Sequence, residues 1–277
     1  MPVIALTQEM GSLAPEVAQL VAQQGKLALM RHEVLEGVAG KMQVPASLIS
    51  RLREGKAGRR ERRSVDIQEI AVYTAKEVFA LADKGDVVLR GWGATCLLHP
   101  VQHVVTVRIT RPFEKRVAWL MENLGIDDLP SAQAEVRRSD ESHATRMHAV
   151  FGVTWGDPLL YDIVLNTDRI SVESCAAQIL ELARRPEFKE SKASRAQLAD
   201  LALAAAVRGA LKENEATREV NVDIHADKGK VVLRGLVLNK KELDETVRVT
   251  GTVAGVRKVD NQLRQMAVYR RFTQAKS

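Results

Sequence analysis

The residues that could do chemistry begin with a glycine–serine pair near the N-terminus. Gly11 and Ser12 follow an apolar run, residues 3–7, and precede an amphipathic segment, residues 16–21. Such a turn between a strand and a helix can present backbone amides and a helix N-terminus to a phosphate group. An ordinary strand-to-helix turn has the same pattern. We therefore treat Gly11 and Ser12 as candidate phosphate-binding residues.

The turn lacks the cation that phosphoryl transfer requires. A complete phosphate-binding loop reads G-x-x-x-x-G-K-[ST], and its lysine neutralises the β- and γ-phosphates of the donor. Here Leu13, Ala14 and Pro15 follow the pair, and no lysine or arginine occurs before Lys26. Pro15 suits the first turn of a helix but removes one amide donor. The turn therefore favours a weak phosphate contact over full kinase chemistry.

Most of the excess positive charge lies in one segment. The chain has a net charge of +6, and residues 51–64 contain seven basic and two acidic residues, a net of +5. Such a segment attracts phosphates, nucleic acid or anionic lipid, and a solvated loop can have the same composition. Four of its arginines are candidate phosphate-binding residues: Arg51, Arg53, Arg59 and Arg60.

A second group of arginines occurs in a charged stretch of helical character, residues 130–150. A single arginine on a helix is usually a solvated surface residue. A cluster that includes Arg137 could instead bind phosphate through charge-assisted hydrogen bonds. We add Arg138 and Arg146 to the candidate phosphate-binding residues.

Several other kinds of site are not predicted. Cys96 and Cys175 are too few and too far apart for a metal cluster or a disulfide framework. The histidines form no H-E-x-x-H motif, so we interpret them as non-ligands and predict no metal site. No G-x-S-x-G motif occurs, which argues against a serine hydrolase.

Composition indicates the class of protein and its compartment. Apolar residues make up 45% and charged residues 27% of the chain, as in globular proteins with an adequate core. No run of 18 apolar residues and no secretory signal are visible, so we expect a cytoplasmic protein with reduced thiols. The aromatic content of 4% argues mildly against a base-stacking surface for nucleic acid.

Alternating strands and helices must position the candidate residues. Apolar or alternating runs predict strands at residues 3–7, 87–90, 103–110 and 161–167. Helical spacing predicts helices at residues 66–83, 94–98, 113–124, 130–150 and 172–182, with Asp66 as a cap. This order predicts an α/β fold with a mainly parallel sheet and helices on both faces.

The composition changes near residue 184, and a second domain is predicted. Residues 184–196 are charged, include Pro186 and are interpreted as a linker. Beyond them the predicted order is α-β-β-α-β, with a tight turn at residues 227–229 and Asn239 as a helix cap. The predicted boundaries are a first domain at 1–183, the linker at 184–196 and a second domain at 197–268.

The first domain resembles the cytidylate kinase-like family, a branch of the P-loop nucleoside monophosphate kinases. Residues 151–167, FGVTWGDPLLYDIVLNT, are similar to the family pattern G-x-D-W-x-D-P-x-x-Y-D-L-V-x-N-T, with Thr154 as a departure. Residues 90–94 and 112–117 are similar to its G-R-G-A and P-x-E-x-R segments, and Asp140 and Arg146 lie in the stretch that resembles its lid.

The resemblance implies a P-loop kinase-like fold, with ATP and Mg²⁺ as cofactors if the domain is active. The family loop resembles G-S-G-G-R-E-I-A, whereas Leu13, Ala14 and Pro15 replace its later glycines and arginine. His143 stands where the lid tends to have an arginine. Both departures weaken the implied activity.

The second domain resembles a BON domain, a small α+β module of order α-β-β-α-β. The resemblance rests on residues 229–235, GKVVLRG, and residues 253–263, VAGVRKVDNQL. It implies a binding element for phospholipid or for another protein. BON domains usually occur in secreted or envelope proteins, so a copy fused to a kinase-like domain implies a ligand-sensing role by analogy.

Three hypotheses for function follow. The leading one is a regulatory or sensor protein that binds a nucleotide or another phosphate ligand, is catalytically weak or inactive, and carries a BON interaction module. The second is an active cytidylate or related nucleotide kinase that uses ATP and Mg²⁺. The third is nucleic-acid binding through residues 51–64. The sequence leaves the ligand and a homo-oligomeric state open.

Overall fold

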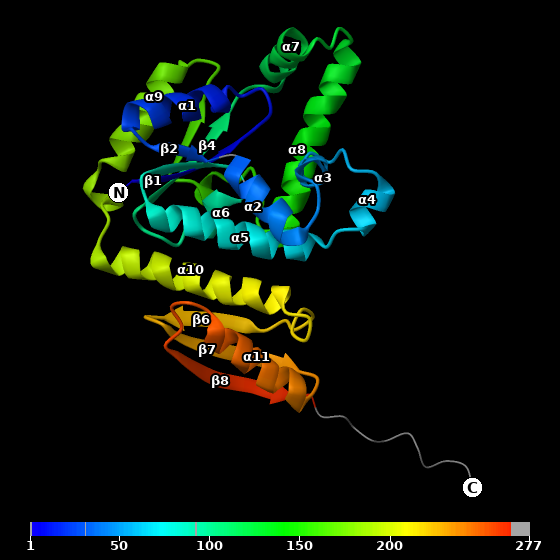
Figure 1. The fold of residues 1–277 in the computed structure, drawn as a ribbon. Helices are drawn as coiled ribbons and strands as arrows, with labels where there is room; N and C mark the ends of the chain where they lie inside the picture. Colours follow the sequence, from blue (N-terminus) through cyan, green and yellow to red (C-terminus); the bar gives the residue numbers. More distant parts are fainter. Residues whose placement is uncertain (1, 31, 92, 267–277) are drawn as a thin grey trace. The chain divides into compact units, whose positions relative to one another are not determined.

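The chain forms two compact units, Met1–Leu198 and Ala199–Ser277, in a computed structural model that describes residues 2–30, 32–91 and 93–266. The first unit is built on a five-stranded parallel sheet of order β2-β3-β1-β4-β5 (Figure 1). The strands, in that order, are Ala28–Met30, Val87–Arg90, Val3–Gln8, Val104–Thr110 and Ile163–Asn166. The predicted α/β fold with a kinase-like parallel sheet is confirmed.

The central strand β1 explains why the opening run of the sequence is apolar without alternation. Its residues from Val3 to Leu6 are fully buried, because helices cover both faces of a parallel sheet. Val3 lies opposite Val87 of β3 and Val104 of β4. All carboxyl ends therefore lie at one edge of the sheet, the edge at which ligands bind in such folds.

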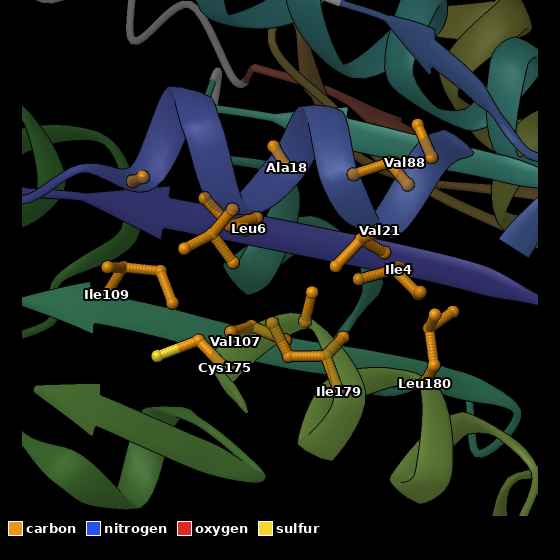
Figure 2. Packing of buried hydrophobic residues seen from close by; sticks show 14 of the residues in the cluster. Ile4, Leu6, Ala18, Val21, Val88, Val107, Ile109, Cys175, Ile179 and Leu180 are labelled. Carbon is orange, nitrogen blue, oxygen red and sulfur yellow. The ribbon is translucent and has the colours of Figure 1, made fainter. Parts of the chain in front are cut away.

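Helices cover the two faces of the sheet, as predicted. α1 (Ala14–Gly25) and α9 (Val172–Ala183) pack together on one face, and α5 (Ile67–Lys84) and α6 (Ala94–Leu98) lie on the other (Figure 1). Figure 2 shows the core beneath α1 and α9, which includes Ile4, Leu6, Ala18, Val21, Ile179 and Leu180. Burying each large side chain contributes about 1.5 to 3 kcal/mol before entropy is subtracted.

Further helices follow the carboxyl ends of strands β2 and β4. α2 (His32–Met42), α3 (Ala46–Arg53) and α4 (Arg59–Arg63) connect β2 to α5, whose predicted cap Asp66 accepts a hydrogen bond from the Gln68 amide. α7 (Phe113–Leu124) and α8 (Leu129–Phe151) follow β4. A 3₁₀ turn, η1 (Pro158–Leu160), precedes β5, which is shorter than the predicted strand. The basic segment is thus the end of α3, a turn and α4 rather than one loop.

The second unit has the predicted order α-β-β-α-β. It contains most of α10 (Lys192–Glu213), β6 (Asp223–Asp227), β7 (Lys230–Val237), α11 (Lys240–Thr252) and β8 (Lys258–Gln265). β7 pairs antiparallel with β6 and parallel with β8. The helices cover one face of this sheet around a core that includes Val207, Val231, Leu233, Val249 and Leu263.

Two local signals in the second unit act as predicted. Lys228 and Gly229 both have positive φ, 48° and 86°, which is the geometry of a tight primed turn between antiparallel strands. The side chain of Asn239 accepts a hydrogen bond from the Glu242 amide at 3.0 Å and begins α11. The hairpin and the second helix are therefore determined by their own residues.

The predicted linker is shorter than expected. It contains a 3₁₀ turn, η2 (Pro186–Phe188), and α10 begins at Lys192, inside the segment predicted as linker. The reason is a reciprocal cap, because the Ser194 amide donates to Ser191 Oγ at 3.1 Å and the Ser191 amide donates to Ser194 Oγ at 3.0 Å. Composition alone did not reveal this cap.

Candidate phosphate-binding pocket

A pocket of about 510 Å³ lies between α3, α4, α5, α6 and α8 of the first unit. α5 contributes lining residues from Ile67 to Thr74, and α8 contributes a longer set from Arg138 to Phe151. Figure 1 labels both helices. The volume suits a small organic ligand. Four arginines line it: Arg53, Arg62, Arg138 and Arg146.

Three of these arginines donate to backbone carbonyls of the turn that follows α3. Arg146 donates to the carbonyl of Arg53, and Arg138 donates to that of Glu54. Arg62 donates to the carbonyls of Ala57 and Gly55, at 2.9 and 3.1 Å. The last carbonyls of a helix have no partner inside the helix, so cations suit this position. The turn thus gathers positive charge from α4 and α8.

The four arginines differ in how much of their charge is left for a ligand. A carboxylate neutralises Arg138, whose guanidinium bonds Glu135. Arg62 and Arg146 have no carboxylate partner among the described residues. Burial lowers the pKa of Arg146 to about 10, so it remains cationic at neutral pH. Glu141 is the acidic residue of the lining, and its side chain is exposed. An anion entering the pocket would therefore be attracted.

Two glycines allow the walls of the pocket to approach closely. Gly55 has φ of 70°, and a Cβ there would lie 2.0 Å from Ser142 Oγ of α8. Gly93 has φ of 68°, and a Cβ there would lie 2.6 Å from the Phe151 ring. Larger residues would be strained at both positions. These contacts hold α8 against the turn after α3 and against the start of α6.

The loop between β1 and α1 is a separate region with different chemistry. Ser12 is fully buried, and its hydroxyl donates to the Glu9 carbonyl at 2.7 Å. A Cβ at Gly11 would lie 2.9 Å from the Arg116 carbonyl, so another part of the chain already lies against this loop. Pro15 occupies the first turn of α1, as predicted. Neither Gly11 nor Ser12 lines the pocket.

Beside this loop, the carboxylate of Glu9 binds two buried arginines. Arg108 donates to it at 2.7 Å, and Arg116 lies 3.5 Å from it. The Thr110 hydroxyl donates to the same carboxylate at 2.6 Å. Asp140 of α8 accepts two hydrogen bonds from Arg116, both at 2.9 Å. The charges of Arg108 and Arg116 are thus neutralised by the protein itself.

His143 lies between the loop region and the pocket. Its ring stacks on Trp155 at 5.1 Å, and Trp155 in turn lies 4.2 Å from the Arg108 guanidinium. Burial lowers the pKa of His143 to about 4, with a further contribution from the charge of Arg146. His143 is therefore neutral at pH 7 and adds no charge to either region.

The candidate residues separate into three groups. Arg53, Arg138 and Arg146 come together in the pocket, from segments more than 80 residues apart. Arg51 pairs with Glu61 at 2.6 Å, and Arg59 and Arg60 are exposed on α4 without lining the pocket. Arg51 of α3 and Arg59 and Arg60 of α4 lie outside the pocket lining, so phosphate binding by these three residues stays a prediction.

Sequence reasoning missed Arg62 as a pocket residue and Glu9 as the partner of Arg108 and Arg116. Arg62 belongs to the basic segment, but only its position on α4 distinguishes it from its neighbours. Glu9 pairs with residues about 100 positions away, and no local pattern indicates such a pair.

Among residues 2–30, 32–91 and 93–266, no group of three or more His, Cys, Asp or Glu side chains is placed to hold a metal ion. Over the same residues, no helix has the length and apolar character needed to cross a bilayer.

The model of the cytidylate kinase-like family matches residues 3–169, and the BON domain model matches residues 199–267. None of the curated proteins compared with the chain matches it. Among solved structures, an uncharacterized protein from Eubacterium ventriosum ATCC 27560 has a TM-score of 0.53 and 20% identity. The match covers 67% of this chain and all of that one, and it supports the fold alone.

Two further structures are more distant. Shikimate kinase from Acinetobacter baumannii, in complex with shikimate, has a TM-score of 0.43 and 12% identity over 68% of this chain and 96% of its own. TT1252 from Thermus thermophilus has a TM-score of 0.39 and 19% identity over 66% of this chain and 97% of its own. The family model covers more than half of the residues, and the chain therefore belongs to the cytidylate kinase-like family and carries a C-terminal BON domain.

Proposed function

We propose that the kinase-like domain binds a phosphate-bearing ligand in the pocket between α3 and α8 and transfers phosphoryl groups weakly or not at all. The BON domain would supply the interaction with a protein or lipid partner, so that the chain acts as a sensor or regulatory protein. The observation that carries this proposal is the contrast in charge between the pocket, where Arg62 and Arg146 donate to backbone carbonyls, and the β1–α1 loop, where Glu9 and Asp140 neutralise Arg108 and Arg116.

This contrast bears on catalysis because phosphoryl transfer depends on cations placed around the transferring group. Arg108 and Arg116 are buried cations beside the loop, and both are held by carboxylates. A third buried arginine, Arg90, donates to the Gln8 side chain at 2.9 Å. An incoming phosphate would have to displace Glu9 from Arg108, Arg116 and Thr110 together. Its negative charge would also be repelled by Glu16 at the start of α1.

ATP and Mg²⁺ are the cofactors that the family suggests for an active member, and the described residues fit them poorly. The Ser12 hydroxyl, which could bind Mg²⁺, is buried and donates to the Glu9 carbonyl. Pro15 lacks an amide proton, and Gly11 lies against the Arg116 backbone. We therefore assign no step to this pair of cofactors.

A thermal-shift panel tests ligand binding, because a ligand that binds only the folded state raises the melting temperature. The panel contains nucleotides, cyclic nucleotides and inorganic phosphate, with and without Mg²⁺. We expect phosphate compounds to raise Tm without a requirement for Mg²⁺, and the ligand-induced rise to shrink in Arg146→Gln. The exposed Arg185→Gln is the control. A rise that requires ATP with Mg²⁺ would favour the active kinase instead.

The BON domain is proposed to fold by itself, in keeping with the boundaries predicted from the sequence. Its core is contributed by residues of α10, the three strands and α11. Limited trypsin digestion should cut after Arg184 or Lys189, before the capped start of α10 at Lys192. The resulting fragment should unfold cooperatively on heating, whereas early cuts within residues 220–260 would contradict the proposal.

A further inference from the structure

The walls of the pocket are apolar over most of their extent. α5 presents Ile67, Ile70 and Ala71, α6 presents Leu97, and the end of α8 presents Val150 and Phe151. Ile67 is 53% exposed although it is a large aliphatic residue at the first position of α5. An apolar residue that lines a pocket and is open to water is available for contact with an apolar ligand.

The polar groups that read a nucleotide base are scarce here. Among the described lining residues there is no asparagine, glutamine, aspartate or histidine, and the uncharged polar side chains are Thr74, Ser142 and Thr145. A base buried without partners for its ring nitrogens and exocyclic groups binds poorly, because each unsatisfied group loses its hydrogen bonds to water. An apolar body has no such groups to satisfy.

The basic turn after α3 and the Phe151 ring lie in different parts of the pocket. Arg62 and Arg138 donate to carbonyls of that turn, and Arg138 lies about 20 Å along α8 from Phe151 at 1.5 Å per residue, whereas Arg146 lies about 7.5 Å from it. Phe151 instead lies against Gly93 at the start of α6. A ligand that fits both ends has an anionic group at one end and an apolar body at the other.

We infer that the ligand of this pocket is an amphipathic phosphate monoester with an apolar body, rather than a nucleotide whose base is read by hydrogen bonds. This inference rests on the proposed function. A phosphate suits the basic end because its oxygens can accept bonds from several guanidinium groups at once. The body, aliphatic or aromatic, would lie along Ile67, Ile70 and Phe151.

Calorimetric titration of the full chain tests the class of ligand. The probes are 1-naphthyl phosphate, geranyl phosphate, 1-naphthoate, 1-naphthol, CMP and inorganic phosphate. We expect naphthyl phosphate or geranyl phosphate to bind at least roughly tenfold more tightly than CMP and inorganic phosphate. Only the two amphipathic probes combine a phosphate group with an apolar body that the pocket can bury. The stronger of the two tells whether the body is aromatic or aliphatic.

Two matched pairs of variants locate the binding site. Ile67→Ser should weaken naphthyl phosphate about threefold to tenfold. Leu129→Ser should not, although Leu129 is 50% exposed at the first position of another helix, α8. Arg62→Gln should weaken the same probe by a similar factor, whereas the exposed Arg63→Gln on the same helix should not. All four sites are on the surface, so the folded state should tolerate each change.

Each other outcome counts against the inference in a distinguishable way. Tighter binding of CMP than of both amphipathic phosphates would overturn the inference and leave the proposed function standing. Tighter binding of naphthoate or naphthol would overturn the phosphate head. Equal effects within each pair of variants would place the ligand elsewhere. Binding of no phosphate compound at all would contradict the inference and the proposed function together.

Discussion

The β1–α1 loop region and the α3–α8 pocket use arginine in opposite ways. Arg108 and Arg116 beside the loop donate to the carboxylates of Glu9 and Asp140, which cancel their charge. In the pocket, Arg62 and Arg146 donate to backbone carbonyls, which hold the guanidinium in place without cancelling it. A cation held by carbonyls remains available to an anionic ligand, whereas one held by a carboxylate does not.

Catalysis gives the largest expected difference between the two regions. If the loop region is closed to the donor phosphate, phosphoryl transfer from ATP to CMP should be lower by orders of magnitude than the roughly 1 to 100 per second of working kinases. A coupled assay of the full chain measures this. Turnover within that range would break the comparison, because Arg108 and Arg116 would then be available for catalysis.

Removing the charge of Glu9 should affect stability strongly. Glu9→Gln leaves the buried Arg108 without a carboxylate partner, while Arg116 keeps Asp140, and we expect the free energy of unfolding to fall by about 3 kcal/mol. Glu9 is 13% exposed in its pair with Arg108. The control is Glu61→Gln, whose exposed pair with Arg51 should cost at most about 1 kcal/mol. Urea denaturation measures both, and equal effects would mean that Glu9 only positions the arginines.

Acid should destabilise the chain through His143, which faces arginines of both regions. Arg146 and Arg53 act from the pocket and Arg108 from the loop region, and with burial they lower its pKa to about 4 in the folded state. The unfolded chain binds the proton near pH 6.5. Stability should therefore fall between pH 6.5 and 4, by on the order of 3 kcal/mol.

The pH dependence is measured by urea denaturation across this window, with His143→Gln as the comparison. The variant lacks the titrating group, so its stability should fall less over the same range. Identical pH dependence of the free energy of unfolding in the two proteins would show that groups other than His143 control acid sensitivity. The arginines of the two regions would then not act on stability through His143.

The smallest effect is expected on the outer face of α4. Arg59 and Arg60 are exposed and do not line the pocket. Unlike the arginines of the loop region and of the pocket, they are accessible to large polyanions. The double variant Arg59→Gln, Arg60→Gln should elute from heparin at lower salt, with the salt slope reduced by about 2. The control is the double variant Arg184→Gln, Arg185→Gln, which changes two adjacent exposed arginines outside α4. If both double variants lower the eluting salt concentration equally, nucleic-acid binding through α4 is contradicted.

Local residues determined those parts of the fold that the sequence predicts well. The bounds of α6 and α7, the primed turn at Lys228 and Gly229, and the Asn239 cap all agree with prediction. Each depends on side chains within a few positions of the element itself. The β2 strand was not predicted, because its three residues are held by pairing with β3, about 60 positions away.

The chemistry of the candidate site was decided by the tertiary structure. The sequence shows that the β1–α1 loop lacks a lysine and that arginines are abundant, and both statements hold. It does not show that Glu9 reaches Arg108 or that Arg146 reaches the end of α3, since both contacts span more than 90 residues. An arginine has the same charge in every sequence, but its partner in the fold, a carboxylate or a carbonyl, decides whether that charge is left for a ligand.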